Sequence, residues 1–167
     1  RAADAGIASV MVLGIGLGAV PVLDAGSTPE TAYLAGGCFW GMEQLLREVD
    51  GVVDTEVGYV DAAGGGHGVA ETVRVRFDPS VVSYEELLRF YFRIHDPTTR
   101  NRQGNDIGSE YRSAIFVVDE QQRRTAERVR TEVDASGFWN RPLVTEIADA
   151  GQFEVAEEGH QDYLTKN

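Results

Sequence analysis

The chain has 167 residues, of which 43% are hydrophobic and 25% are charged, so it is long enough for one domain with a substantial core. Its formal net charge of −12 argues against nucleic acids and anionic membrane surfaces as partners. A single cysteine among these residues excludes an internal disulfide, a Cys-x-x-Cys redox pair and a multi-thiolate zinc site. The three histidines have no zinc-type spacing, and we expect neither a metal nor an organic cofactor.

The first 30 residues differ in composition from the rest of the chain. Ala5 to Leu23 carries no charge, and Ile7 to Val20 is rich in Val, Leu, Ile, Ala and Gly, which is typical of a secretory signal or a short membrane anchor. Asp24 to Glu30 has the composition of a linker. We therefore expect a signal-like or anchor-like segment with its linker over residues 1–30 and a single domain over 31–167. An exported or membrane-anchored protein is favoured over a cytoplasmic one.

Hydrophobic periodicity predicts the elements of that domain. In residues 73–77, for example, apolar and charged side chains alternate as in a half-buried strand, and Ser83 with Glu86 has the form of a capping box at the start of a helix. The predicted strands are 31–35, 52–59, 73–77, 111–118 and 143–148, and helices are expected after Cys38 and over 83–95, 119–136 and 156–164. Their irregular alternation indicates an α/β fold, an α+β sandwich in which helices flank a mixed or antiparallel central sheet with a ferredoxin-like core.

Two segments are predicted to be loops. Asp96 to Glu110 is a run of fifteen residues with almost nothing apolar, and a polar loop of that length is usually functional or disordered. Asp61 to Gly68 is rich in glycine.

Cys38 follows two glycines and precedes apolar residues at helical spacing, so we expect its thiol at a helix N-terminus. The helix dipole contributes only about 0.3–1 kcal/mol, less than the roughly 1.4 kcal/mol of one pKa unit. A second contribution is needed to make the thiol a nucleophile. Phe39 and Trp40 would place apolar surface beside the sulfur. From this stretch alone, a small buried hydrophobe is the commoner role of a lone cysteine.

Several further motifs accompany this cysteine in a recognisable order. They are Gly37-Cys38-Phe39-Trp40-Gly41 with Glu43, Val57-Gly58-Tyr59, Gly66-His67, Ala70-Glu71, His95-Asp96-Pro97-Thr98, Asn101-Arg102-Gln103-Gly104-Asn105-Asp106, Tyr111-Arg112-Ser113, and His160-Gln161 with Tyr163-Leu164. From Tyr33 to Asn167 the chain closely resembles peptide methionine sulfoxide reductases of the A type.

The resemblance implies an enzyme that reduces the S epimer of methionine sulfoxide, free or in oxidised proteins. Cys38 would attack the sulfoxide sulfur as a thiolate and become a sulfenic acid. Glu71 would protonate the leaving oxygen, which requires a carboxyl pKa raised by burial or by hydrogen bonds to the acid form.

The resemblance also assigns the substrate-binding residues. Phe39 and Trp40 would hold the S-methyl group, whereas Asp106 and Tyr111 would hydrogen-bond the substrate or an active-site water. His95 is expected to have a structural role. His160 and Tyr163 are expected one turn apart on the last helix, holding the C-terminal segment over the site.

Two departures from the family pattern affect the predicted chemistry. The chain has only Val60 to Gly66 between Tyr59 and His67, where family members usually carry an Asn-Pro-Thr-Tyr motif whose tyrosine helps to bind the sulfoxide oxygen. Tyr111 must then act alone or with Tyr59. The second departure is the absence of a resolving cysteine, so an external thiol such as thioredoxin, glutaredoxin or a small molecule is expected to reduce the sulfenic acid. A monomer is expected.

Two other functions remain open on the sequence. The shortened loop is compatible with a weak or inactive module that binds oxidised methionine, although binding alone requires neither Cys38 nor Glu71. A Cys-His hydrolase using His67, His95 or His160 as its base is the second alternative.

Overall fold

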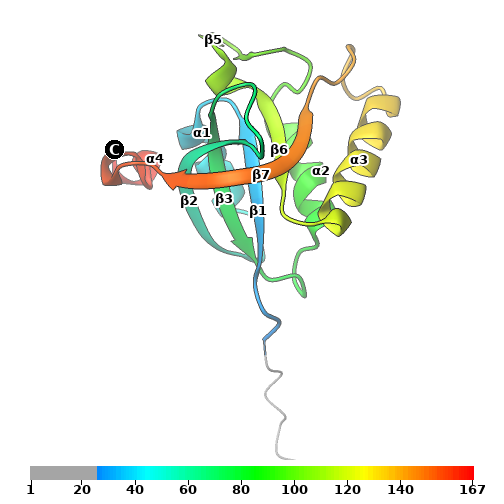
Figure 1. Cartoon of the computed structure of the whole chain (residues 1–167). Helices are drawn as coiled ribbons and strands as arrows, with labels where there is room; N and C mark the ends of the chain where they lie inside the picture. Colours follow the sequence, from blue (N-terminus) through cyan, green and yellow to red (C-terminus); the bar gives the residue numbers. More distant parts are fainter. Residues whose placement is uncertain (1–25) are drawn as a thin grey trace, which may run out of the picture.

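In the computed structural model of the protein, which describes residues 26–167, five strands close into a barrel in the order β1-β3-β2-β7-β6 (Figure 1). Their bounds are β1 Glu30–Gly36, β2 Val52–Ala62, β3 Ala70–Phe77, β6 Ser113–Val117 and β7 Glu146–Val155. β6 and β7 run parallel, and the other four neighbouring pairs are antiparallel. The predicted mixed sheet is therefore confirmed.

The predicted ferredoxin-like sandwich is wrong, because the sheet is closed. β1 pairs with both β3 and β6, and β7 pairs with both β2 and β6, so none of the five strands is left as an edge. β2 has 11 residues and β7 has 10, a length that lets a twisted sheet curl round until its ends meet.

The helices pack on the outer face of this barrel. They are α1 Phe39–Arg47, α2 Tyr84–Ile94, α3 Glu120–Ala135 and the short α4 Tyr163–Lys166. Alternate strand residues divide the apolar side chains into two clusters: Ala32 and Leu34 pack with helix residues, whereas Tyr33 and Ala35 pack with side chains from other strands inside the barrel. The larger cluster, between the barrel and the helices, forms the main core.

Local signals located most elements correctly. Ser83 and Glu86 form the expected capping box at the start of α2, and α3 has Asp119 as its N-cap, which accepts a hydrogen bond from the Gln122 N–H. The expected strand 143–148 lies farther along the chain, as β7.

Two segments differ in kind from the prediction. The expected helix 156–164 is a 3₁₀ turn, Glu158–His160, followed by α4, because Asp162 between them has a left-handed backbone with φ of 53°. The polar loop contains the two-stranded hairpin β4 Arg102–Gln103 and β5 Asp106–Ile107, then the 3₁₀ turn Ser109–Tyr111. The expected strand 111–118 is thus shortened at its start.

Within residues 26–167, no helix is both long and apolar enough to cross a membrane. This finding corrects the expectation of an exported or membrane-anchored protein, since the structure gives an anchor no support. The apolar run Ile7 to Val20, on which that expectation depended, lies outside the described residues.

Candidate active site

Cys38 lies between β1 and α1, as the N-cap residue of the helix. The preceding Gly37 has a φ of 97°, which L-residues with a side chain rarely adopt. A Cβ added to Gly37 would come within 2.5 Å of Gln103 Cγ. Glycine is therefore required here both by the backbone conformation and by the neighbouring side chain.

The surroundings of Cys38 hold its thiol in the protonated form. Burial raises the pKa of Cys38 above its ordinary value, and the charges of Glu71 and Asp106 raise it further. The backbone N–H groups of Trp40 and Gly41 act in the opposite direction and favour the thiolate. The helix start thus assists ionisation but does not outweigh burial, as its small dipole energy predicts.

Glu71, on β3, faces the first residue of α1. Its Oε2 accepts a hydrogen bond from the Phe39 N–H at 3.0 Å. Burial is the largest influence on the Glu71 carboxyl and raises its pKa, and the charges of Asp106 and Glu110 raise it further. The hydrogen bond from Phe39 and the interaction with His160 lower this pKa. The net upward direction keeps the carboxyl protonated at a higher pH than a solvated glutamate.

Aromatic side chains surround the start of α1. The Phe39 ring centroid lies 5.5 Å from that of Tyr59 and 5.7 Å from that of His160. Trp40 stacks on Tyr163 with ring centroids 3.8 Å apart, and its Nε1–H donates to His160 Nδ1 at 3.3 Å. His160 and Tyr163 thus hold the C-terminal segment against Trp40, as expected, although they belong to two short elements and not to one helix.

The polar loop brings Asp106 and Tyr111 to the same place. The charge of Asp106 acts on Cys38, Glu71 and Tyr111. The charge of Glu71 is the largest cause raising the pKa of the Tyr111 phenol, and burial, assisted by Glu71, raises that of Tyr59. Both phenols therefore remain protonated donors at neutral pH.

Gln103 is a site residue that the sequence reasoning missed. Its Oε1 accepts from the Asp96 N–H at 2.9 Å and its Nε2 donates to the Asp96 carbonyl at 3.0 Å, while its side chain packs on Gly37. Gln103 therefore connects the end of α2 to the turn before Cys38. Gln103 belongs to one of the recognised motifs, but the sequence did not indicate this role, because Gly37 and Asp96 are far apart in the chain.

The histidines do not form a Cys-His pair with Cys38. His95 is 5% exposed, its Nδ1 lies 2.7 Å from the Tyr91 carbonyl and its Nε2 lies 2.7 Å from Ser113 Oγ, and burial lowers its pKa to about 4. This arrangement fits the structural role expected for His95. The Nδ1 atom of His160 accepts a hydrogen bond from Trp40. The structure therefore offers no support for the hydrolase alternative.

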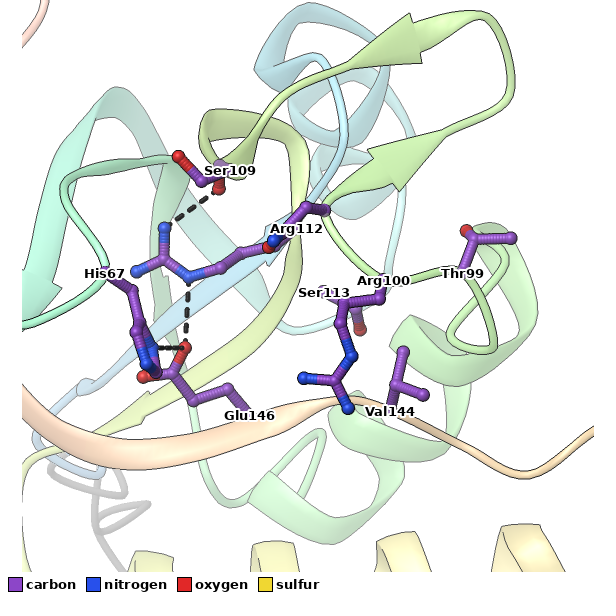
Figure 2. Close-up of a pocket in the computed structure, with 9 residues that line it drawn as sticks. His67, Thr99, Arg100, Ser109, Arg112, Ser113, Val144 and Glu146 are labelled. Atoms are coloured by element: carbon purple, nitrogen blue, oxygen red, sulfur yellow. Dashed lines mark hydrogen bonds and ion pairs between the residues drawn. The ribbon is translucent and has the colours of Figure 1, made fainter.

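His67 belongs to a separate cavity of about 350 Å³ beside the shortened loop (Figure 2), which is not lined by Cys38 or Glu71. In Figure 2, His67 and Arg112 converge on Glu146, at 3.3 and 3.0 Å. Arg112 also donates to the carbonyls of Ser109 and Gly68, both at 2.9 Å. It therefore fastens the end of the shortened loop to the turn that carries Tyr111.

The chain is similar to proteins of one family. The family model described as peptide methionine sulfoxide reductase matches residues 30–167. The peptide methionine sulfoxide reductase MsrA 1 of Mesorhizobium japonicum is 53% identical over 146 residues, which cover 84% of this chain and 85% of that protein.

Solved structures agree. Mxr1 from Saccharomyces cerevisiae in reduced form superposes with a TM-score of 0.77 at 35% identity, covering 84% of this chain and 86% of that one. Mxr1 from Saccharomyces cerevisiae in complex with Trx2 has a TM-score of 0.63 at 31% identity, and the match covers 81% of this chain and 85% of that one. With its cysteine, carboxyl and aromatic residues gathered at one helix start, the chain belongs to the peptide methionine sulfoxide reductase family.

Proposed function

We propose that Cys38, Glu71 and Tyr111 catalyse the thiol-dependent reduction of methionine-S-sulfoxide, free or in oxidised proteins, and that residues 31–167 are the catalytic domain. The observation that carries these assignments is the 3.0 Å hydrogen bond between Glu71 Oε2 and the Phe39 N–H. It puts the Glu71 carboxyl, whose pKa is raised by burial, next to the residue that follows Cys38.

The first step needs one negative charge and one proton at the site. Because a Glu71 carboxylate raises the pKa of Cys38, protonating Glu71 removes that obstacle to the thiolate. The acid then delivers its proton to the sulfoxide oxygen while the thiolate attacks the sulfur. The attack forms a bond between Cys38 Sγ and the substrate sulfur. The hydroxyl then leaves the substrate sulfur and bonds to Sγ while the S–S bond breaks with its electron pair going to the substrate sulfur, so methionine is released, reduced by two electrons, and Cys38 is left as a sulfenic acid. The Phe39 N–H stabilises the carboxylate that remains.

The substrate-binding assignments follow the same geometry. Phe39 and Trp40 offer an apolar wall to the S-methyl group, and Asp106 lies close enough to influence Cys38 electrostatically. Tyr111 and Tyr59, both protonated donors, take over the binding of the sulfoxide oxygen. Tyr59 packs on Phe39 and is suited to replace the tyrosine that the shortened loop lacks.

Turnover is completed by two thiols from outside the site. The first displaces the sulfenic oxygen as water and forms a mixed disulfide with Cys38, and the second releases the Cys38 thiol and leaves as a disulfide. A thioredoxin is a suitable donor, supported by the complex of Mxr1 with Trx2. Glutaredoxin or a small thiol would satisfy the same stoichiometry. The monomeric state and the lack of any cofactor besides this thiol stay predictions.

The test is dithiothreitol-driven reduction of a methionine sulfoxide peptide, with the two sulfoxide epimers followed separately. We expect loss of the S epimer only, and no turnover with Cys38→Ser. Full activity of Cys38→Ser would refute the assignment of the nucleophile. Saturable binding by a well-folded wild-type protein, without turnover, would instead establish the binding-module alternative.

A further inference from the structure

Arg112 is a buried cation that joins three segments of the chain. It is 5% exposed and lies between the 3₁₀ turn that carries Tyr111 and the start of β6. Its Nη1 donates to the Ser109 carbonyl and its Nη2 to the Gly68 carbonyl, both at 2.9 Å, while its Nε donates to Glu146 Oε2 at 3.0 Å. Figure 2 shows the guanidinium between Ser109 and Glu146. Because a guanidinium holds its donors in one rigid plane, these bonds fix the three partners relative to one another.

The guanidinium connects the Tyr111 turn to the barrel. Inside the turn, the Tyr111 N–H donates to the Gly108 carbonyl at 3.1 Å, a local bond that sets the shape of the turn and not its place. Among residues 26–167, the hydrogen bonds of residues 109–111 all end within 108–112. Those of the Arg112 side chain also reach β7 and Gly68, two residues before β3. The turn lies beside β3, and its placement there depends on Arg112.

Tyr111 needs this connection more than Glu71 does. Glu71 pairs with Tyr59 in the barrel, and its carboxyl accepts from the Phe39 N–H at 3.0 Å, so the sheet and α1 both hold it. Tyr111 belongs to a single 3₁₀ turn, which has few hydrogen bonds and poorer hydrogen-bond geometry than an α-helix. Before that turn, Gly108 has a φ of 152°, so the backbone there has additional freedom. A displaced guanidinium would therefore move Tyr111 and leave Glu71 in place.

We propose that Arg112 is a positioning residue for Tyr111, holding its turn so that the phenol reaches the sulfoxide oxygen at Cys38. This inference rests on the proposed function of Tyr111 as a donor to that oxygen. Lysine retains the positive charge but carries it as a compact ammonium on a flexible stem. It can keep the ion pair with Glu146, but it does not reproduce the planar connection between the two carbonyls. Arg112→Lys is therefore the variant that removes the positioning and retains the charge.

The first measurement is ¹⁹F NMR of the full chain labelled with 3-fluorotyrosine, in which the Tyr111 resonance is the one missing from Tyr111→Phe. We expect Arg112→Lys to shift or broaden this resonance and to leave that of Tyr59, on the barrel, in place. Arg74→Lys is the matched control, because Arg74 pairs with Glu56 at 2.6 Å and should affect neither resonance. An unchanged Tyr111 resonance in Arg112→Lys, or an equal change at Tyr59, would overturn the proposal.

The second measurement is kcat/KM for dithiothreitol-driven reduction of a methionine sulfoxide peptide by wild type, Arg112→Lys, Tyr111→Phe and the double variant. We expect Arg112→Lys to be slower by about tenfold to 10²-fold, the effect of misplacing a substrate-positioning group, and Arg74→Lys to equal wild type. Because residues that act as a unit are not additive, the double variant should be no slower than Tyr111→Phe. Losses that multiply in the double variant would show that Arg112 does not act through Tyr111.

The two measurements separate this inference from the proposed function. A wild type without turnover would refute the proposed function, and the ¹⁹F comparison would still decide whether Arg112 positions Tyr111. An active wild type matched in rate by Arg112→Lys would overturn the inference alone.

Discussion

At the scale of single residues, the proposed chemistry depends on how Cys38 and Glu71 influence each other. Both pKa values are raised, and burial is the largest cause for each. Only one of the two groups is readily charged, because a carboxylate at Glu71 opposes the Cys38 thiolate. The reactive form, thiolate with protonated acid, is thus a minority form whose population depends on both groups.

The first prediction concerns the pH dependence of kcat/KM. The fraction of protonated Glu71 falls as the pH rises through the raised pKa of its carboxyl. The fraction of Cys38 thiolate increases with pH until the higher pKa of Cys38 is passed. Between the pKa of Glu71 and the pKa of Cys38, the loss of protonated acid and the gain of thiolate cancel. The kcat/KM of the wild type should therefore be constant between these two pKa values, as a plateau, and fall at lower and at higher pH. Glu71→Gln should be about 10²–10⁴-fold slower and should rise about tenfold per pH unit across that plateau.

The measurement is sulfoxide reduction with saturating reductant from pH 5 to 10, on wild type and Glu71→Gln in parallel. Aspartate at this position, Glu71→Asp, is the matched control that retains the acid and should restore a plateau. A plateau in Glu71→Gln would show that Glu71 is not the proton donor.

At the scale of elements, the turn between β1 and α1 positions Cys38, the proposed nucleophile. Gly36 fits closely against His95, where an added Cβ would come within 2.9 Å of the ring, and Gly37 fits against Gln103. The two glycines therefore allow the end of the strand, the α2 end and the polar loop to meet at Cys38. Close packing on both sides leaves the turn little freedom to move the sulfur.

The second prediction compares two glycines four residues apart. Gly37→Ala would combine a φ of 97° with a clash against Gln103, so it should lower both stability and kcat/KM. Gly41→Ala, within α1, meets no atom within 4 Å and should stabilise the protein by about 0.5–1 kcal/mol. Thermal unfolding and peptide turnover of both variants test this. Equal stability of the two variants would contradict the role assigned to the turn.

At the scale of the whole molecule, the C-terminal segment completes the site from the far end of the chain. Glu43, on α1, is 1% exposed and accepts hydrogen bonds from Thr55 Oγ1 at 3.0 Å and the Asp162 N–H at 3.1 Å. Arg47 pairs with Glu43 at 2.9 Å and also with Asp162. The buried Glu43 carboxylate, with the partly exposed Arg47 and Asp162, therefore fastens the C-terminal segment to α1, next to Trp40.

The third prediction is that Glu43→Ala releases this segment. Losing a hydrogen bond to a charged group costs about 1.5–3 kcal/mol, and freeing Tyr163 and His160 should expose Trp40. We expect a red-shifted tryptophan emission, faster proteolysis after Asp162 and a raised KM. Glu48→Ala, at the exposed end of α1, is the matched control. Unchanged tryptophan emission and KM in a folded Glu43→Ala protein would show that Glu43 does not hold the C-terminal segment at the site for substrate binding.

Much of the local structure could be predicted from the sequence because its causes are local. Alternation in residues 73–77 located β3, the capping box of Ser83 and Glu86 located α2, and the apolar spacing after Cys38 located α1. Errors occurred where local signals were weak. Asp162 has a left-handed conformation that interrupts the predicted last helix, and the polar loop has too few apolar residues to indicate its hairpin.

The sequence by itself determined the family, the place of Cys38 at a helix start and the types of residue that accompany it, because short contiguous motifs carry this information. Only the tertiary structure decided that the sheet closes, that Gln103 reaches Gly37, and that the Glu71 carboxyl faces Phe39. These features join segments distant in the chain. Both raised pKa values at the site depend on burial and on charges that only the fold brings together.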